Sequence, residues 1–344
     1  MNVSKRVGMV AGLAALSLGL SACGGSGSSS SSSSGAGKLT VYNAQHDDLM
    51  KAVLDGFTKT TGIQVQMRDG SDSELANQIV QEGKASPADV FVTENSPAMT
   101  LVDSKSLFAK LDQGTLDQVP DQYEPASGTW TGFAARSTVL AYNSKQLKAT
   151  QLPASILDLA KPEWKGKVAF SPSGADFQAI VSAVVTTAGE QKAAEWLAGL
   201  KRNGKVYQGN STVMKAVNAG EVATGIIYHY YWYKDRAESG ANSKDVVLHH
   251  FTPGDAGNFV SVSGVGVLAS SANKAQAQRL VKYMTSKAGQ EALSGSTALE
   301  YSIASDVPAN PVLPPLSSLG APAVQLGSLN GPKVVALMQR AGLL

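Results

Sequence analysis

In the first part of the chain, the spacing of hydrophobic residues changes repeatedly between the spacing typical of strands and that typical of helices. The run LTVYN at 39–43 predicts a strand, and apolar residues then recur at every fourth position, which predicts a helix ending at Gly62. Two further strand patterns, IQVQM at 63–67 and ADVFVT at 88–93, flank a second short helical pattern. Strand, helix, strand, helix, strand is the order of an α/β domain with a largely parallel sheet.

The same alternation continues toward the C-terminus. Strand patterns occur at 137–143, 167–176 and 222–228, with helical patterns between them, and a last helix has Pro332 near its first turn. No repeat with a fixed period is present. Two α/β lobes joined by crossover strands near 137–143 and 258–264 fit this order best, with an interlobe cleft where a ligand could bind.

These patterns divide the chain as follows. We expect a first lobe formed by residues 38–137 plus 262–312. A second lobe should comprise residues 138–261 plus 313–344. Residues 38–344 together are long for a single hydrophobic core and sufficient for two.

The first residues have the features of an export signal. Lys5 and Arg6 precede the apolar run 10–20, which is too short to span a bilayer comfortably. The sequence LSAC follows and ends at Cys23, the only cysteine, which therefore cannot form an internal disulfide. LSAC resembles the bacterial lipoprotein box, which implies that residues 1–23 are a lipoprotein signal peptide and that Cys23 is acylated.

Residues 24–37 contain almost only Ser and Gly. Such a segment cannot bury enough apolar surface to fold, so we expect a flexible tether to a lipid anchor. The chain has 29 basic and 27 acidic residues, and without Lys5 and Arg6 the counts are 27 and 27. A balanced charge without a basic stripe gives no indication of nucleic-acid binding.

Aromatic residues are concentrated in IIYHYYWY at 226–233, which holds four of the ten tyrosines. Three explanations for this concentration of aromatic residues are core packing, a sugar-stacking face and a metal site. In a continuous strand Tyr230 and Tyr231 would face opposite sides. If the strand instead ends near Tyr228, both could enter one cleft, and the sequence does not choose between these arrangements.

Polar side chains also follow two other predicted strands. His46 comes after the strand at 39–43, and Glu94 comes after the strand at 88–93. Imidazole, carboxylate and phenolate together suit a hard cation, and the absence of thiolate argues against a structural zinc site. Phenols titrate near pH 10, so a strongly acidic cation such as Fe(III) is needed to displace their protons.

Several separated motifs share an order and spacing with one family. They are LTVYNAQH, SPADVFVTEN, SPSGA, GNSTVMKAVNAGE and YYW, and the chain from Lys38 to Leu344 resembles the ferric-ion-binding proteins of bacterial ABC importers. The resemblance implies a two-lobed periplasmic-binding-protein fold of type II, an α/β fold with two crossover strands and an interlobe cleft. It also implies four metal ligands, namely His46, Glu94, Tyr230 and Tyr231.

The resemblance further implies a small synergistic anion, such as phosphate, carbonate or citrate. Its contacts would be Ser173, Gly174 and Ala175 at a helix start, where free N–H groups favour negative charge, together with Asn210 and Arg136. Three positions depart from the family pattern and leave the anion open: Tyr228 stands where some members have Asn, Asn95 replaces Gln, and Thr138 replaces a second Arg.

We therefore expect an extracytoplasmic, lipid-anchored and monomeric protein that binds Fe(III) and delivers it to an ABC permease and its ATPase, without catalysis. An alternative is a binding protein of the same fold for a polyamine, thiamine, phosphonate or sugar, with Arg136 and residues 173–175 binding an anionic group. A hydrolase is disfavoured, because Ser173 lacks the G-x-S-x-G surround and no histidine is marked as its base.

Overall fold

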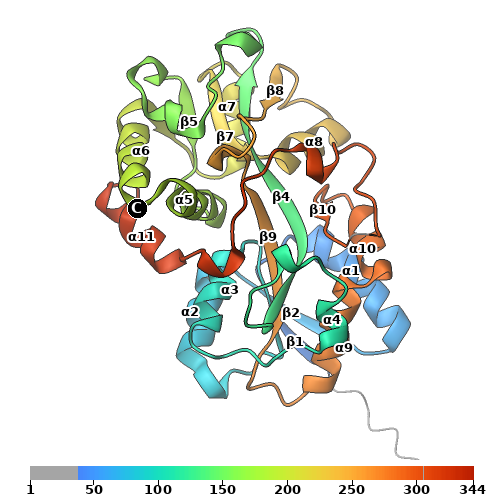
Figure 1. Cartoon of the computed structure of the whole chain (residues 1–344). Helices are drawn as coiled ribbons and strands as arrows, with labels where there is room; N and C mark the ends of the chain where they lie inside the picture. Colours follow the sequence, from blue (N-terminus) through green and yellow to red (C-terminus); the bar gives the residue numbers. More distant parts are fainter. Residues whose placement is uncertain (1–37, 305) are drawn as a thin grey trace, which may run out of the picture. The chain divides into compact units, whose positions relative to one another are not determined.

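The long strand β4 (Trp130–Asn143) connects two groups of strands. Its first part pairs antiparallel with β9 (Val260–Val267), and its last part pairs antiparallel with β7 (Thr224–Tyr228). Figure 1 shows β4 and β9 side by side between the two groups. These are the two predicted crossover strands. β4 begins earlier than predicted, at Trp130, because the whole segment from there to Asn143 is buried.

The strands of the first lobe precede β4 in sequence. β1 (Leu39–Asn43) lies between β2 (Val65–Asp69) and β3 (Val90–Val92), parallel to both, and β3 pairs antiparallel with β9. The helices that alternate with these strands are α1 (Asp47–Thr61), α2 (Asp72–Glu82) and α3 (Ser96–Asp103). The parallel part of the sheet is therefore as the sequence predicted, with an antiparallel crossover strand at its edge.

The second lobe repeats this arrangement. β5 (Val168–Phe170) lies parallel between β6 (Gly204–Val206) and β7, and β8 (Val246–His249) pairs antiparallel with β4. The helices of this region are α5 (Ala175–Ala188), α6 (Glu190–Asn203), α7 (Asn210–Asn218) and α8 (His229–Glu238). Aromatic side chains of α5 and α6 stack in its core, with the rings of Phe177 and Trp196 5.8 Å apart.

Besides several short 3-10 helices, residues 38–304 and 306–344 contain four further α-helices and one short strand. They are α4 (Gln113–Leu116), α9 (Lys274–Thr285), α10 (Lys287–Ser294), α11 (Gly331–Arg340) and β10 (Tyr301–Ser302). α11 has Pro332 in its first turn as predicted, and it lies beside α5 in Figure 1. β10 pairs with β4 and places the residue before it, Glu300, in the interior.

Helix α1 illustrates how the pattern determines the element. Its apolar residues form one buried face, and it ends at Gly62, whose φ of 73° is the left-handed conformation that glycine adopts at low cost. β2 starts at Val65 rather than at the predicted residue 63, because its first paired residue opposite Leu39 is Val65.

The computed structural model describes residues 38–304 and 306–344, which lie within one compact unit, Ala36–Leu344. In this part of the chain, no helix is long and apolar enough to cross a membrane. The predicted signal peptide (1–23), acylated Cys23 and tether (24–37) lie outside the described residues. The lobe boundaries within the sequence remain a prediction.

Candidate functional site

Three predicted ligands come from the ends of strands. His46 follows β1 and stands at the N-cap position of α1, where its side chain makes no capping hydrogen bond. Glu94 follows β3, and Tyr230 follows β7. In α/β proteins the carboxyl ends of the strands are where ligand groups gather, and this explains why these distant residues meet.

The donor atoms of these three side chains surround one point. Tyr230 Oη lies 3.4 Å from His46 Nε2 and 3.2 Å from Glu94 Oε1, and the latter two atoms are 3.4 Å apart. An octahedral cation with bonds of about 2.0–2.1 Å places neighbouring ligand atoms about 2.9 Å apart. The three atoms are therefore close to the spacing of adjacent ligands, although their role as ligands is itself a prediction.

Tyr231 lies directly against Tyr230. The two rings are 4.2 Å apart between centroids, and Tyr231 Oη donates to Asp176 Oδ2 at 3.3 Å. β7 ends at Tyr228 and α8 begins at His229, so the continuous-strand arrangement is wrong and the alternative with a turn is correct. Both phenols thus belong to the first turn of a helix, where the dipole favours negative charge.

His229 attaches the start of α8 to the crossover strand. Its ring is buried, its Nδ1 accepts a hydrogen bond from the backbone N–H of Ser137 at 3.1 Å, and it stacks on Tyr301. Burial lowers the pKa of His229 to about 3, so the ring is neutral at physiological pH. The neutral ring fixes the first turn that carries the two phenols.

Asp72 holds the loop that carries Glu94. Its two carboxylate oxygens accept the backbone N–H groups of Glu94 and Asn95, at 2.8 and 2.9 Å. Burial raises the pKa of Asp72 to about 7. The residue is in the first turn of α2, and sequence reasoning gave it no role.

Arg136 is fully buried between carboxylates. Its Nη1 is 2.7 Å from Glu94 Oε1, and its Nη2 is 2.8 Å from Glu300 Oε2. Although burial opposes its charge, Glu300 and Glu94 raise the pKa of Arg136. The predicted anion contact is thus already paired with two acidic side chains in this structure.

Glu300 is a site residue that the sequence did not reveal. It is fully buried, and its Oε1 lies 3.1 Å from His46 Nδ1, although the two residues are 254 positions apart. Burial opposes its ionisation, but the Arg136 guanidinium outweighs this and lowers the pKa of Glu300. A carboxylate beside Nδ1 favours the proton there and leaves Nε2 free to bind a cation.

Asp176 is the second residue that was missed. It is in the first turn of α5 and is 6% exposed. Its Oδ2 accepts from Asn210 Nδ2 at 2.6 Å, and its Oδ1 accepts from Asn95 Nδ2 at 3.1 Å. Its place directly after the predicted anion loop was the one available signal.

The predicted anion contacts are only partly brought together. Gly174 caps α5, Ala175 is its first residue, and Asn210 begins α7. Ser173 is exposed and donates to Gln208 Oε1 at 3.1 Å. Among the described residues, hydrogen bonds connect Asn210 to Tyr231 through Asp176, whereas the hydroxyl of Ser173 bonds to Gln208.

The acidic groups at the site are hard to ionise without a cation. Burial raises the pKa of Tyr230 and of Tyr231 well above the ordinary phenol value, and the negative charge of Asp176 raises both further. Burial and Asp176 also raise the pKa of Glu94. A cation that binds here must therefore displace protons. Across residues 38–304 and 306–344, no group of three His, Cys, Asp or Glu could hold a metal, so such a site depends on the phenols.

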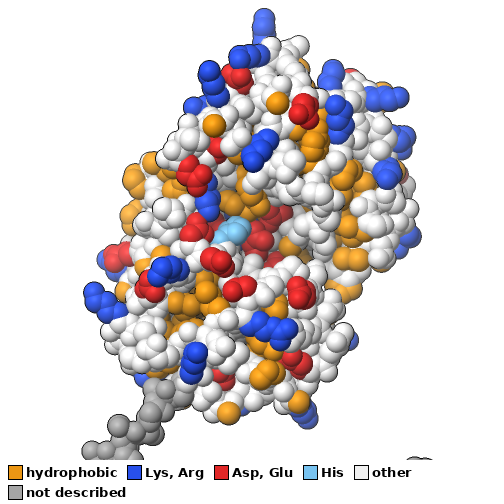
Figure 2. All heavy atoms as spheres, turned by 180° about the vertical axis from the view of Figure 1, so that it is seen from behind, with side chains coloured by type: hydrophobic (Ala, Val, Ile, Leu, Met, Phe, Trp, Pro, Cys, Tyr) orange, Lys and Arg blue, Asp and Glu red, His pale blue; other side chains and the backbone are white. Residues whose placement is uncertain are grey.

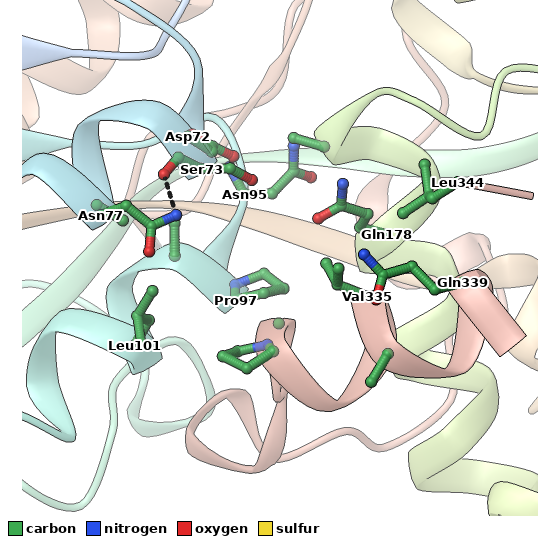
Figure 3. A pocket seen from close by; sticks show the side chains of 16 residues that line it. Asp72, Ser73, Asn77, Asn95, Pro97, Leu101, Gln178, Val335, Gln339 and Leu344 are labelled. Carbon is green, nitrogen blue, oxygen red and sulfur yellow. Dashed lines mark hydrogen bonds between the residues drawn. The ribbon is translucent and has the colours of Figure 1, made fainter.

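Two hollows in the surface belong to this region. Figure 2 shows a histidine with acidic side chains beside it in a hollow of one face. A separate pocket of about 470 Å³ has Asn95, Ala175 and Gln178 in its lining. Figure 3 shows its amides alongside apolar side chains such as Leu101 and Val335. This second lining lacks His46, Glu94 and the two phenols, so the pocket is not the candidate metal site.

Comparison with protein families gives one match over most of the chain. Residues 85–319 match the family described as bacterial extracellular solute-binding protein. An Fe(3+)-binding periplasmic protein of Serratia marcescens is 58% identical over 306 residues, which cover 89% of this chain and 90% of the relative. The major ferric iron-binding protein of Neisseria meningitidis serogroup B is 35% identical over 308 residues, covering 89% and 93%.

Solved structures agree with these sequence matches. Iron-bound HitA from Pseudomonas aeruginosa superposes with a TM-score of 0.84 at 40% identity, covering 89% of this chain and 99% of HitA. A Trichodesmium protein in complex with iron and citrate gives 0.78 at 26% identity, covering 90% and 100%. The predicted two-lobed type II fold is therefore confirmed.

Proposed function

Because the chain belongs to the family of bacterial extracellular solute-binding proteins, we propose that it captures Fe(III) in the interlobe cleft through His46, Glu94, Tyr230 and Tyr231. The observation that carries the proposal is the position of Tyr230 Oη, within 3.4 Å of both the imidazole and the carboxylate. Oxygen donors with one imidazole suit a hard cation. The relatives described as ferric-iron-binding proteins support the same identity of the ion.

Iron binding would also join the two lobes. His46 and Glu94 follow strands of the first lobe, whereas Tyr230 and Tyr231 are on α8 beside β7 in the second. An ion with ligands from both sides stabilises the closed arrangement relative to an open one, with a hinge in the crossover strands. We place the lobe boundaries as the sequence predicted, at 38–137 plus 262–312 and 138–261 plus 313–344.

Delivery to a transporter completes the proposed role. The relatives are solute-binding proteins rather than enzymes, in agreement with the expected absence of catalysis. The protein would pass Fe(III) to an ABC permease driven by its ATPase. We further propose that it acts outside the cytoplasm as a monomer, with acylated Cys23 as its membrane anchor.

Four side chains leave two positions of an octahedral ion without a protein ligand. The resemblance assigns them to a small anion (phosphate, carbonate or citrate) and to water, with Ser173–Ala175, Asn210 and Arg136 as the contacts of the anion. The structure of the Trichodesmium protein with iron and citrate supports an anion in the family.

The test is a titration of metal-free protein with ferric nitrilotriacetate. We expect a coloured complex with one iron per protein, and Tyr230→Phe or Tyr231→Phe should remove most of the visible phenolate-to-iron absorption. Tyr207→Phe is the matched control, because Tyr207 pairs with Glu221 at the surface. Calorimetry with a polyamine, thiamine, a phosphonate and a sugar tests the alternative, and binding of one of these without iron would overturn the proposal.

A further inference from the structure

We propose that the outer end of the second lobe is a docking surface for anionic phospholipid headgroups. Its contacts are nine exposed basic side chains, which we call the basic pole. They are Lys145, Lys148, Lys161, Lys165, Lys167, Lys201, Arg202, Lys205 and Lys244. The inference goes beyond the proposed capture of iron and does not depend on it, because none of these residues belongs to the candidate metal site.

The two lobes carry opposite net charges, although the chain from residue 38 onward is balanced. Residues 38–137 plus 262–312 contain 12 basic and 17 acidic residues, whereas residues 138–261 plus 313–344 contain 15 and 10. The balanced total therefore conceals an acidic first lobe and a basic second lobe. A charge separation of this kind orients a molecule beside a charged surface.

Strand directions place the basic pole at one end of the second lobe. β7 ends at Tyr228, next to the candidate iron site, so it begins at the outer end of the lobe. β5 and β6 run in the same direction as β7, whereas β4 runs in the opposite direction and ends where they begin. The segments that adjoin these strand ends are 144–149, 158–167, 201–205, 219–223 and 241–245. All nine residues of the basic pole are in these segments.

Hydrogen bonds join these segments into one surface. The backbone carbonyl of Asn203 accepts from the N–H of Gly166 at 2.7 Å, and Lys205 Nζ donates to the carbonyl of Glu221 at 2.9 Å. Further contacts link Lys167 to Thr224, Gln146 to Gly220 and Ser144 to Asp245. Figure 2 shows Lys and Arg side chains gathered at the upper end of the molecule, where Figure 1 places β5, β7 and β8.

The acidic residues of the same segments neutralise only part of this charge. They are Asp158, Glu163, Glu221 and Asp245, which leaves an excess of five positive charges. Within residues 38–304 and 306–344, two lysines of the basic pole form ion pairs, Lys145 with Asp245 and Lys161 with Asp158. Exposed pairs of this kind are weak, so they do not prevent either lysine from contacting an anionic surface.

The composition of the basic pole fits a lipid surface better than a protein or a nucleic acid. Eight of its nine residues are lysines, and Lys is depleted at protein–protein interfaces, where Tyr, Trp and Arg anchor the contact. The one aromatic residue of the five segments, Trp164, is buried, so these segments offer no stacking platform for nucleic-acid bases. Lysines spread over several loops instead suit an extended array of phosphates.

The proposed membrane anchor at Cys23 would keep such a surface close to the bilayer. A lipid chain and a polybasic patch together hold a protein on a membrane more firmly than either alone. The basic pole would therefore bring the second lobe, and not only the anchored end of the chain, to the membrane surface.

The experiment measures whether vesicles protect the lysines of the basic pole from an amine-acetylating reagent. The full-length protein is mixed with excess vesicles of phosphatidylcholine alone, or of phosphatidylcholine mixed with phosphatidylglycerol, at low and at high salt. Mass spectrometry then quantifies the acetylation of each lysine. An acyl anchor contributes equally to both kinds of vesicle, so the difference between them reports the headgroup charge.

Two triple variants change the net charge equally at different ends of the protein. The pole variant combines Lys148→Glu, Lys165→Glu and Lys167→Glu. The matched control combines Lys84→Glu, Lys105→Glu and Lys110→Glu, at exposed positions of the first lobe. Both variants should bind iron as the wild type does, so a failure of iron capture would be seen separately from a failure of docking.

For the wild type at low salt, vesicles with phosphatidylglycerol should slow acetylation of the basic pole at least about threefold relative to phosphatidylcholine. High salt should abolish the difference, because screening weakens the attraction. Lys84, Lys105 and Lys110 should react equally with both vesicles. The pole variant should lose the protection of Lys205 and Lys244, whereas the first-lobe variant should keep it.

Equal acetylation of the basic pole with both kinds of vesicle would overturn the inference. So would equal protection of the first-lobe lysines, or loss of protection in the first-lobe variant, since either would show a general effect of charge. Polyaspartate in place of vesicles tests an acidic protein partner. Protection by polyaspartate without protection by phosphatidylglycerol would assign the surface to such a partner and also overturn the proposal.

Discussion

His46 Nδ1 lies 3.1 Å from Glu300 Oε1, and this contact orients the imidazole toward Tyr230. The buried carboxylate also pairs with Arg136, so it links the first predicted ligand to the charge at the centre of the site. An acceptor beside Nδ1 fixes the tautomer that presents the Nε2 lone pair, and such partners strengthen metal binding.

Replacement of Glu300 should therefore weaken iron binding without removing the phenolates. For Glu300→Gln we expect an affinity lower by about 10- to 100-fold, with the visible band retained at saturation. Competition with a ferric chelator measures the affinity. Glu221→Gln serves as a control at the surface, and an unchanged affinity in Glu300→Gln would refute the positioning role.

Proton release provides a second prediction. Burial, followed by the charge of Asp176, raises the pKa of Tyr230 and of Tyr231 above the ordinary phenol value, so both phenols are protonated before iron binds at neutral pH. Each phenol must lose its proton to become a ligand, so binding should release at least about two protons per Fe(III) and weaken as pH falls. Calorimetry in buffers of different ionisation enthalpy counts these protons. Release of fewer than about two would contradict the ligand set.

An ion pair joins α1 and α8, which lie on the two sides of the proposed iron site. Lys234 Nζ is 2.6 Å from Asp48 Oδ2, with both side chains about one-third exposed. Partly exposed pairs contribute about 0.2–1 kcal/mol, so Lys234→Met should accelerate iron release about 1.4- to fivefold at low salt. Stopped-flow transfer to a chelator measures the rate. The difference should shrink as salt rises, and a salt-independent difference would indicate a packing effect instead.

The support of Glu94 by Asp72 gives a fourth prediction. In Asp72→Asn one acceptor becomes an amide donor facing a backbone N–H, so one hydrogen bond is lost and two donors oppose each other. We expect the free energy of unfolding to fall by about 1–3 kcal/mol and iron binding to weaken as well. Urea unfolding of the metal-free protein and chelator competition measure the two effects. Asp89→Asn, in another buried network of the same lobe, should reduce stability without a comparable loss of iron affinity.

The sequence correctly indicated which candidate site residues follow the ends of strands. His46, Glu94 and Tyr230 follow predicted strands, and the fold brings these ends together as parallel topology requires. The conformation of the tyrosine run was not decidable, because β7 could have continued past Tyr228. The structure resolves it with a helix that begins at His229, which is fixed to Ser137 by a contact across 92 positions.

Glu300 and Asp176 could not be placed from the sequence. Glu300 precedes a two-residue strand with no recognisable pattern, and its partner His46 is 254 positions away. Asp176 had an ordinary explanation, since an acidic residue in the first turn of a helix stabilises the helix dipole. Only the contact with Tyr231, 55 positions away, distinguishes it from such a residue.

The most direct measurement of the central claim is the visible spectrum during titration of the metal-free protein with ferric nitrilotriacetate. We predict an absorption band that saturates at one iron per protein. The band should persist in Tyr207→Phe and be largely lost in both Tyr230→Phe and Tyr231→Phe. A band that survives in both of these variants, or the absence of any band in the wild-type protein, would contradict it.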